Sequence, residues 1–174
     1  MTGPLPDYCL QALSSLRILS AAYNQLEGSI PFTLLSELHE LQEIWLQENQ
    51  FTGELELGLY KMVSLTHLCL DHNLLTGEIS PKISKLQQLK YLSLAQNQLS
   101  GVIPESIIGL QELEVLSLHS NRLTGKVPMF LEMIPRLDEL RLYGNEGLVD
   151  EKGERIDRSS IVTVKSAIQK QRNG

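Results

Sequence analysis

The chain has few of the residues that mark several common classes of protein. Only 5% of its 174 residues are aromatic, so aliphatic side chains have to fill the interior. It has two cysteines, Cys9 and Cys69, in different sequence contexts, which argues against a disulfide framework. None of its seven asparagines lies in an Asn-x-Ser/Thr acceptor site, which disfavours a glycosylated secreted protein. Leucine, the dominant apolar residue, therefore carries most of the information about the fold.

Long apolar runs and an excess of positive charge are also lacking. The apolar runs are too short to cross a bilayer, and no basic segment followed by an apolar one opens the chain, so we predict no membrane insertion by this chain. The formal net charge is −6; residues 150–174 hold four acidic and six basic side chains, which leaves residues 1–149 at −8. An acidic body repels phosphate backbones, which excludes nucleic acid as the predicted partner.

The asparagines recur at a nearly constant interval. The first spacing is 25 residues and the next four are 24, through Asn24, Asn49, Asn73, Asn97, Asn121 and Asn145. Apolar residues stand eight, five and three positions before each asparagine, as in "LKYLSLAQN". A repeat of this length indicates a solenoid, in which each unit packs only on its neighbours.

Each unit contains a strand and a return segment. In "YLSLA", residues 91–95, apolar residues alternate with others as in a half-buried strand, and after Gly101 the apolar spacing becomes three or four, as on a helical turn. A turn inside a stacked coil leaves buried backbone groups that need partners. Since an asparagine side chain both donates and accepts, we predict that the six asparagines form a buried ladder between neighbouring coils.

The segments "LRILSAAYNQLEGSIP", "LKYLSLAQNQLSGVIP" and "LEVLSLHSNRLTGKVP" resemble the plant-specific class of leucine-rich repeats, LxxLxLxxNxLxGxIP. Receptor-like kinase ectodomains and polygalacturonase-inhibiting proteins contain such repeats. The resemblance covers residues 1–149. It implies an α/β solenoid in the form of a right-handed arc, with a parallel sheet on the concave face and 3₁₀ or short helical turns on the convex side.

The two ends depart from the pattern. Residues 1–16 match only the second half of a repeat, so we expect the chain to begin inside a larger array. In the sixth unit the apolar slot after Asn145 falls on Gly147, so we expect the solenoid to end there. Residues 150–174 are then a C-terminal cap or tail, for which "SSIVTVKSAIQ" allows either a helix or a strand.

Three rows of outward-facing strand residues are the candidate binding surface. They stand six, four and two positions before each asparagine and mix polar, charged and aromatic types, in contrast to the uniform inward leucines. Trp45, Tyr91 and Tyr143 are the expected anchors, since large rings on a rigid sheet bind at little entropic cost. The candidate partner-binding residues are Glu43, Trp45, Gln47, His67, Cys69, Asp71, Tyr91, Ser93, Ser117, His119, Arg141 and Tyr143.

The segment "HLCLDH", residues 67–72, combines side chains that bind metals or catalyse reactions. Alternate residues on a flat strand are nearly 7 Å apart, by a rough estimate from the strand rise, so His67, Cys69 and Asp71 do not converge as zinc ligands must. An open sheet also supplies no oxyanion hole or cleft. We therefore predict no metal, no cofactor and no catalytic residue.

The sequence favours a non-enzymatic interaction module that binds a protein or peptide on its concave face. The resemblance also permits a fragment of an extracellular receptor-kinase ectodomain, or a secreted hydrolase inhibitor. The lack of a signal peptide, a glycosylation acceptor and a disulfide cap slightly favours the cytoplasm for the chain as written, whereas a receptor fragment would be extracellular.

Overall fold

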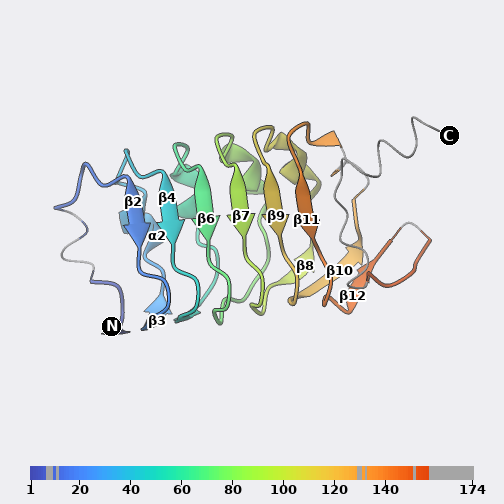
Figure 1. The fold of residues 1–174 in the computed structure, drawn as a ribbon, viewed down its shortest axis with the longest axis horizontal. Helices are drawn as coiled ribbons and strands as arrows, with labels where there is room; N and C mark the ends of the chain where they lie inside the picture. Colours follow the sequence, from blue (N-terminus) through green and yellow to red (C-terminus); the bar gives the residue numbers. More distant parts are fainter. Residues whose placement is uncertain (7–9, 11, 129–130, 132, 151, 157–174) are drawn as a thin grey trace.

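The computed structural model describes residues 1–6, 10, 12–128, 131, 133–150 and 152–156. They form a row of coils, and each coil contributes one strand to a parallel six-stranded sheet (Figure 1). The strands are β2 (Ile18–Ser20), β4 (Glu43–Trp45), β6 (His67–Cys69), β7 (Tyr91–Ser93), β9 (Val115–Ser117) and β11 (Glu139–Arg141). The predicted solenoid is confirmed.

The six-stranded sheet is held in register by its inward residues. The middle residue of each strand faces the core, and Leu68, Leu92 and Leu116 are fully buried. Leu68 pairs with Leu92 and Leu92 with Leu116, so aliphatic side chains stack in a continuous row. A shift of one residue would turn this row outward, which fixes the register and with it the set of residues on the other face.

A second set of short strands, of which all but the first follow an asparagine, lies along the lower edge of the molecule in Figure 1. It forms two parallel three-stranded sheets. One contains β1 (Thr2–Gly3), β3 (Gln25–Ser29) and β5 (Gln50–Thr52), and the other β8 (Ser100–Val102), β10 (Arg122–Lys126) and β12 (Gly147–Val149). Between them the third unit continues the main-chain hydrogen bonding from Gly53 to Ser100 through Thr76 and Gly77.

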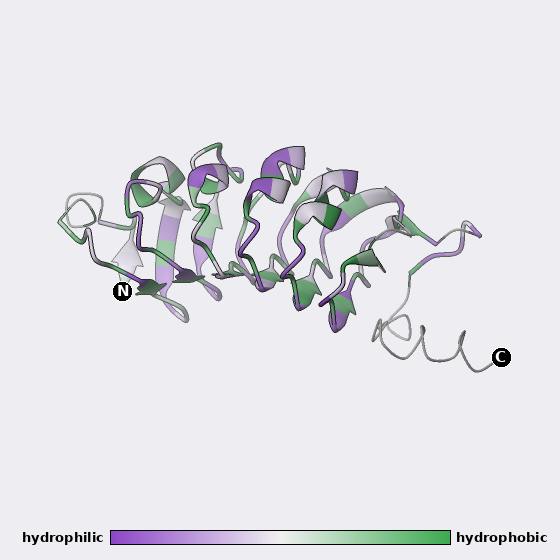
Figure 2. Ribbon diagram, turned by 90° about the horizontal axis from the view of Figure 1, so that it is seen from above, coloured by the Kyte–Doolittle hydropathy of each residue, from purple (hydrophilic) through white to green (hydrophobic). Residues whose placement is uncertain are grey.

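Short helical turns return the chain on the side away from the six-stranded sheet, as Figure 2 shows from above. They are α2 (Phe32–Leu35) and the 3₁₀ turns η1 (Leu59–Lys61), η2 (Pro81–Lys85) and η3 (Glu105–Gly109). Each directs at least one apolar residue into the core, such as Ile83 from η2 and Ile107 from η3. Proline begins η2 because its fixed φ suits the first helical position and its missing N–H would lack a partner there.

The asparagine side chains connect neighbouring coils. Asn97 accepts a hydrogen bond at Oδ1 from the backbone N–H of Leu75, one coil back, at 3.0 Å. Its Nδ2 donates to the carbonyl of Leu70, also one coil back, and to those of Leu94 and Ala95 in its own coil. Asn49, Asn73, Asn121 and Asn145 accept and donate equivalently. At the N-terminal end, the α-amino group of Met1 donates to Asn24.

The residue before each asparagine adopts a left-handed backbone conformation. Its φ lies between 51° and 56° in Tyr23, Glu48, His72, Gln96 and Ser120, and Gly144 has φ 69°. This conformation is uncommon for residues other than glycine and persists where the surrounding structure determines it. It turns the chain out of the strand.

The last described coil differs from the sequence expectation. Gly147 does not fill the apolar slot; Leu148 does, and it is fully buried. One extra residue in the turn makes this possible, and β12 pairs with β10. The second sheet therefore continues past Asn145. The predicted division between residues 1–149 and a cap or tail at 150–174 stays a prediction, because residues 157–174 lie outside the described part of the chain.

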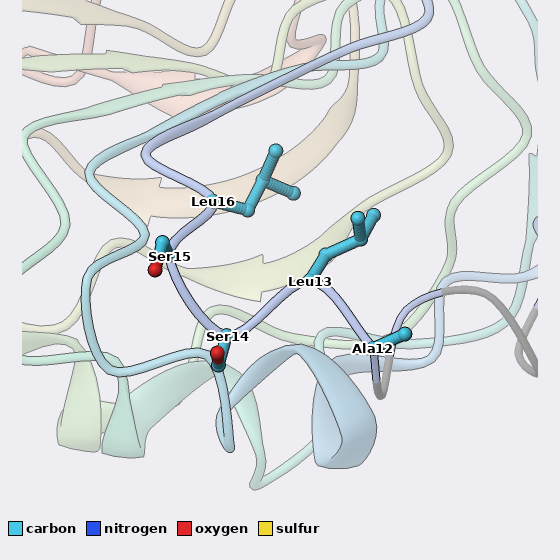
Figure 3. A pocket seen from close by; sticks show the side chains of 5 residues that line it. All are labelled: Ala12, Leu13, Ser14, Ser15 and Leu16. Carbon is cyan, nitrogen blue, oxygen red and sulfur yellow. The ribbon is translucent and has the colours of Figure 1, made fainter.

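At the N-terminal end, Leu16 packs on the core while Leu13 is 43% exposed. Figure 3 shows these two leucines beside a shallow pocket formed with Ala12, Ser14 and Ser15. Cys9 lies outside the described residues, and Cys69 is a free, buried cysteine. Among the described residues, no helix is long and apolar enough to span a membrane.

Candidate functional site

The outward surface of the six-stranded sheet, which we call the concave face, contains all twelve candidate residues. The structure differs from the sequence expectation at its centre. Cys69, Ser93 and Ser117, four positions before their asparagines, are exposed by 4%, 2% and 1%, because larger neighbours surround these small side chains. They form the floor of the face. The half-buried residues on either side are more accessible than these three, and contact of a partner with Cys69, Ser93 and Ser117 stays a prediction.

Three aromatic side chains from neighbouring strands form one cluster on this face. The ring of Trp45 lies 5.7 Å from that of His67 and 5.8 Å from that of Tyr91, and the rings of His67 and Tyr91 are 6.2 Å apart, centroid to centroid. Trp45 Nε1 donates to a carboxylate oxygen of Glu43 at 2.8 Å, which fixes the indole. We call Trp45, His67 and Tyr91 the Trp45 cluster. Such contacts hold large rings in place before any ligand binds.

A second aromatic pair lies further along the face. His119 on the turn after β9 stacks on Tyr143 after β11, with ring centroids 4.6 Å apart. Nδ1 of His119 is 2.9 Å from the hydroxyl of Ser117, which fixes the imidazole ring. We call His119 and Tyr143 the His119 pair. Tyr143 was an expected anchor, and its ring contact gives it a defined orientation.

Asp71 organises the floor between the two groups of rings. Its carboxylate accepts hydrogen bonds from the thiol of Cys69, the hydroxyl of Ser93 and the backbone N–H of Ala95, the last at 2.7 Å. Burial, together with the negative charge of Asp71, raises the pKa of the Cys69 thiol to about 12. The pKa of Tyr91 is raised above its ordinary value by burial first, and then by Cys69 and Asp71.

A polar depression of about 300 Å³ lies over this floor. Its lining includes Tyr91 of the Trp45 cluster and His119 of the His119 pair, so the depression connects the two. The other lining residues are Tyr23, Gln47, Glu48, Asp71, His72, Ser93, Ala95, Gln96, Ser117 and Arg141. The twelve candidate binding residues did not include Tyr23, Glu48, His72 and Gln96. Their signal is their place directly before an asparagine, where the left-handed turn brings the side chain to the rim.

The charged and reactive side chains of the concave face already have partners within the protein. The Arg141 guanidinium forms an ion pair with Glu139, so its positive charge is already paired. The thiol of Cys69 donates to Asp71, whereas Nδ1 of His67 is 2.9 Å from Oγ1 of Thr66. A protonated, buried thiol is a poor nucleophile. Over the described ranges, no group of three or more His, Cys, Asp or Glu residues is placed to hold a metal ion.

Comparison with known proteins agrees with this geometry. The family model described as leucine rich repeat matches residues 63–123 and 87–146. A probable inactive receptor kinase of Arabidopsis thaliana is 38% identical over 64 residues, which are 36% of this chain and 10% of that protein.

Two solved structures match a larger share of the chain. The plant peptide hormone receptor RGFR1, in complex with RGF2, is 34% identical with a TM-score of 0.81 over 85% of this chain and 23% of its own. The ectodomain of the receptor kinase SOBIR1 from Arabidopsis thaliana is 30% identical with a TM-score of 0.72, over 76% of this chain and 72% of its own.

The fold and its repeated asparagines define a leucine-rich-repeat protein, and the chain belongs to the plant leucine-rich-repeat family. It spans about a tenth of the receptor kinase and about a quarter of RGFR1. These relatives are receptors or parts of receptors, and they do not support the cytoplasmic location that the sequence slightly favoured.

Proposed function

We propose that the concave face binds a peptide or protein ligand, as part of the extracellular ectodomain of a plant receptor-like protein. The observation that carries this proposal is the Trp45 cluster. Its three rings lie on the solvent side of a sheet whose other side is uniformly aliphatic, and their mutual contacts fix them in place. Preorganised tryptophan and tyrosine side chains are the commonest sources of binding energy at protein interfaces.

Two further observations support the proposal. RGFR1, which matches 85% of this chain, was solved in complex with RGF2, and the ectodomain of SOBIR1 matches 76%. The face also has a shallow polar depression over a floor of small side chains, which suits an extended chain better than a compact molecule. The function is binding without catalysis: the thiol on this face is protonated and buried.

The test is selection from a displayed library of random 12-residue peptides on the immobilised protein, followed by affinity measurements on variants. Trp45→Ala and Tyr91→Ala should each weaken binding of a selected peptide by about 30-fold, which corresponds to about 2 kcal/mol. His39→Ala and Lys85→Ala are the matched controls, because both side chains are exposed on the convex side. They should change affinity by less than about twofold, by the usual neutrality of residues outside an interface. Peptides that respond to the convex pair and ignore the concave pair would place binding on the other side of the arc.

A further inference from the structure

The two groups of rings lie at opposite margins of the concave face. His67 and Tyr91 of the Trp45 cluster stand six positions before their asparagines, and the Trp45 ring leans toward them. His119 and Tyr143 stand two positions before theirs. The Trp45 cluster is centred on β6, whereas the His119 pair spans β9 and β11. A straight line between them therefore crosses the sheet diagonally.

The length of this diagonal follows from strand geometry. Two and a half strand spacings, at about 4.8 Å each, separate the groups across the sheet by about 12 Å. Four residues along a strand, at about 3.3 Å each, separate them by about 13 Å in the other direction. The diagonal is therefore about 18 Å, which an extended peptide covers in about five residues at 3.3–3.6 Å per residue.

The surface under this diagonal offers little hydrogen bonding to a ligand. The carboxylate of Asp71 already accepts three hydrogen bonds, and the hydroxyls of Ser93 and Ser117 are paired with Asp71 and His119. An uncharged ligand group would have to displace these bonds, with little net gain. Most of the binding energy therefore has to come from the rings at the two ends.

The same surface carries an excess of negative charge. Asp71 and Glu48 line the depression, with an oxygen of Glu48 3.6 Å from Nδ1 of His72, while the guanidinium of Arg141 is paired with Glu139. The donors that Asp71 holds are uncharged, so its full negative charge stays beside the ring of Tyr91. A carboxylate next to an aromatic ring attracts a cation through both the charge and the ring face.

We propose that the occupant is an extended peptide that crosses the concave face diagonally, with two aromatic or large apolar side chains about five residues apart and a lysine or arginine between them. One anchor contacts the Trp45 cluster and the other contacts the His119 pair, and the basic side chain lies over Asp71. This inference rests on the proposed function and adds the chemistry and spacing of the ligand.

The test uses the peptides selected from the random 12-residue library and their synthetic derivatives. The selected sequences should share two anchors at a spacing of about five with a basic residue between them. Deleting or inserting one residue between the anchors should weaken binding at least tenfold. Replacing the first anchor by alanine should remove most of the effect of Trp45→Ala, and replacing the second should remove most of the effect of Tyr143→Ala. When one substitution removes the effect of the other in this way, the two side chains are in direct contact.

The charge is tested separately. Asp71→Asn keeps the Oδ1 acceptor for Ala95 and Ser93 but removes the negative charge, and should weaken binding about tenfold. The same variant should have no effect on a peptide whose basic residue is replaced by norleucine. Glu56→Gln is the matched control, since Glu56 is exposed in the return segment before η1 and should leave affinity unchanged.

The outcomes separate this inference from the function on which it rests. Peptides that depend on Trp45 and Tyr91 but show no fixed anchor spacing, or carry acidic residues in place of basic ones, would overturn the inference and leave the proposed function intact. A selection that yields no peptide dependent on Trp45 and Tyr91 would overturn the proposed function itself.

Discussion

Replacing Asn97 by alanine tests the ladder that holds the coils together. Asn97 is 9% exposed, and its side chain makes four hydrogen bonds to backbone groups. The three carbonyls keep other donors: Leu70 receives one from Asn73, Leu94 from Asn121 and Ala95 from the N–H of His72. The buried N–H of Leu75 loses the acceptor that Asn97 provided.

The expected loss of stability follows from this count. One orphaned buried donor costs about 1–3 kcal/mol, and the weakened carbonyl bonds add to it, so we expect about 2–3 kcal/mol in total. The free energy of unfolding should be measured by urea denaturation followed by circular dichroism. Asn24→Ala is the matched control: its Nδ2 donates to the carbonyls of Ala21 and Ala22, but its Oδ1 accepts only an exposed hydrogen bond from the α-amino group of Met1. No buried backbone N–H loses its acceptor, so the loss should stay below about 1 kcal/mol. If the two variants lose the same stability, the inner asparagine does not hold the coils as described.

Four further predictions concern stability, thiol labelling, titration and exchange. Gly58→Ala should cost more than about 2 kcal/mol in urea denaturation, because the new Cβ would lie 2.5 Å from backbone atoms of Phe32 and Thr33; Gly109→Ala should cost less, since the nearest atom there belongs to the Ser84 side chain, and equal costs would refute the argument. Cys69 should resist thiol reagents in the native state when Cys9 is replaced by serine, and rapid labelling at pH 8 would contradict its burial. Because the folded thiol has a pKa of about 12 against an ordinary value of 9.0, the stability it contributes is complete below pH 9 and falls as the pH rises toward 12; a Cys69→Ala variant with the same alkaline slope would exclude this origin. Hydrogen exchange should be faster in β2, at the edge of the sheet beside the exposed Leu13, than in β7 at its centre, and uniform slow exchange would show that something else protects that end.

The repeat length made much of the fold predictable. Residues that recur every 24 positions have equivalent environments, so the alternation around Leu92 and the spacing of Ile103 and Ile107 predict one inward strand face and one inward turn face for every coil. The positive φ of the glycine four places after each of the first five asparagines, between 77° and 86°, also follows from residue type.

Other features depend on packing that the pattern does not record. The left-handed residues before the asparagines range from tyrosine to serine, so no residue type marks them. The shift of the apolar slot to Leu148 depends on one extra residue in the last turn. Gly58 lies against the backbone of the preceding coil, a close approach that no spacing rule reveals.

The sequence predicted which surface holds the candidate site, but it did not predict how the side chains on that surface contact one another. Alternation places Trp45, His67 and Tyr91 on one face, but their contacts depend on how far each ring reaches. Trp45 occupies a different row from the other two, and only its long side chain brings it within 6 Å of Tyr91. The burial of Ser93 has the same cause, since a small residue among larger ones becomes a floor.

The claim that the concave face binds the ligand is tested most directly by mapping backbone amide chemical shifts while a selected peptide is added to the isotopically labelled protein. The shifts should change first in β4, β6, β7, β9 and β11 and in the turns that follow them, with the largest changes near Trp45 and Tyr91. The amide chemical shifts of η1, η2 and η3 should not change. Shift changes concentrated in those convex turns, with the shifts of the strands unchanged, would contradict the claim.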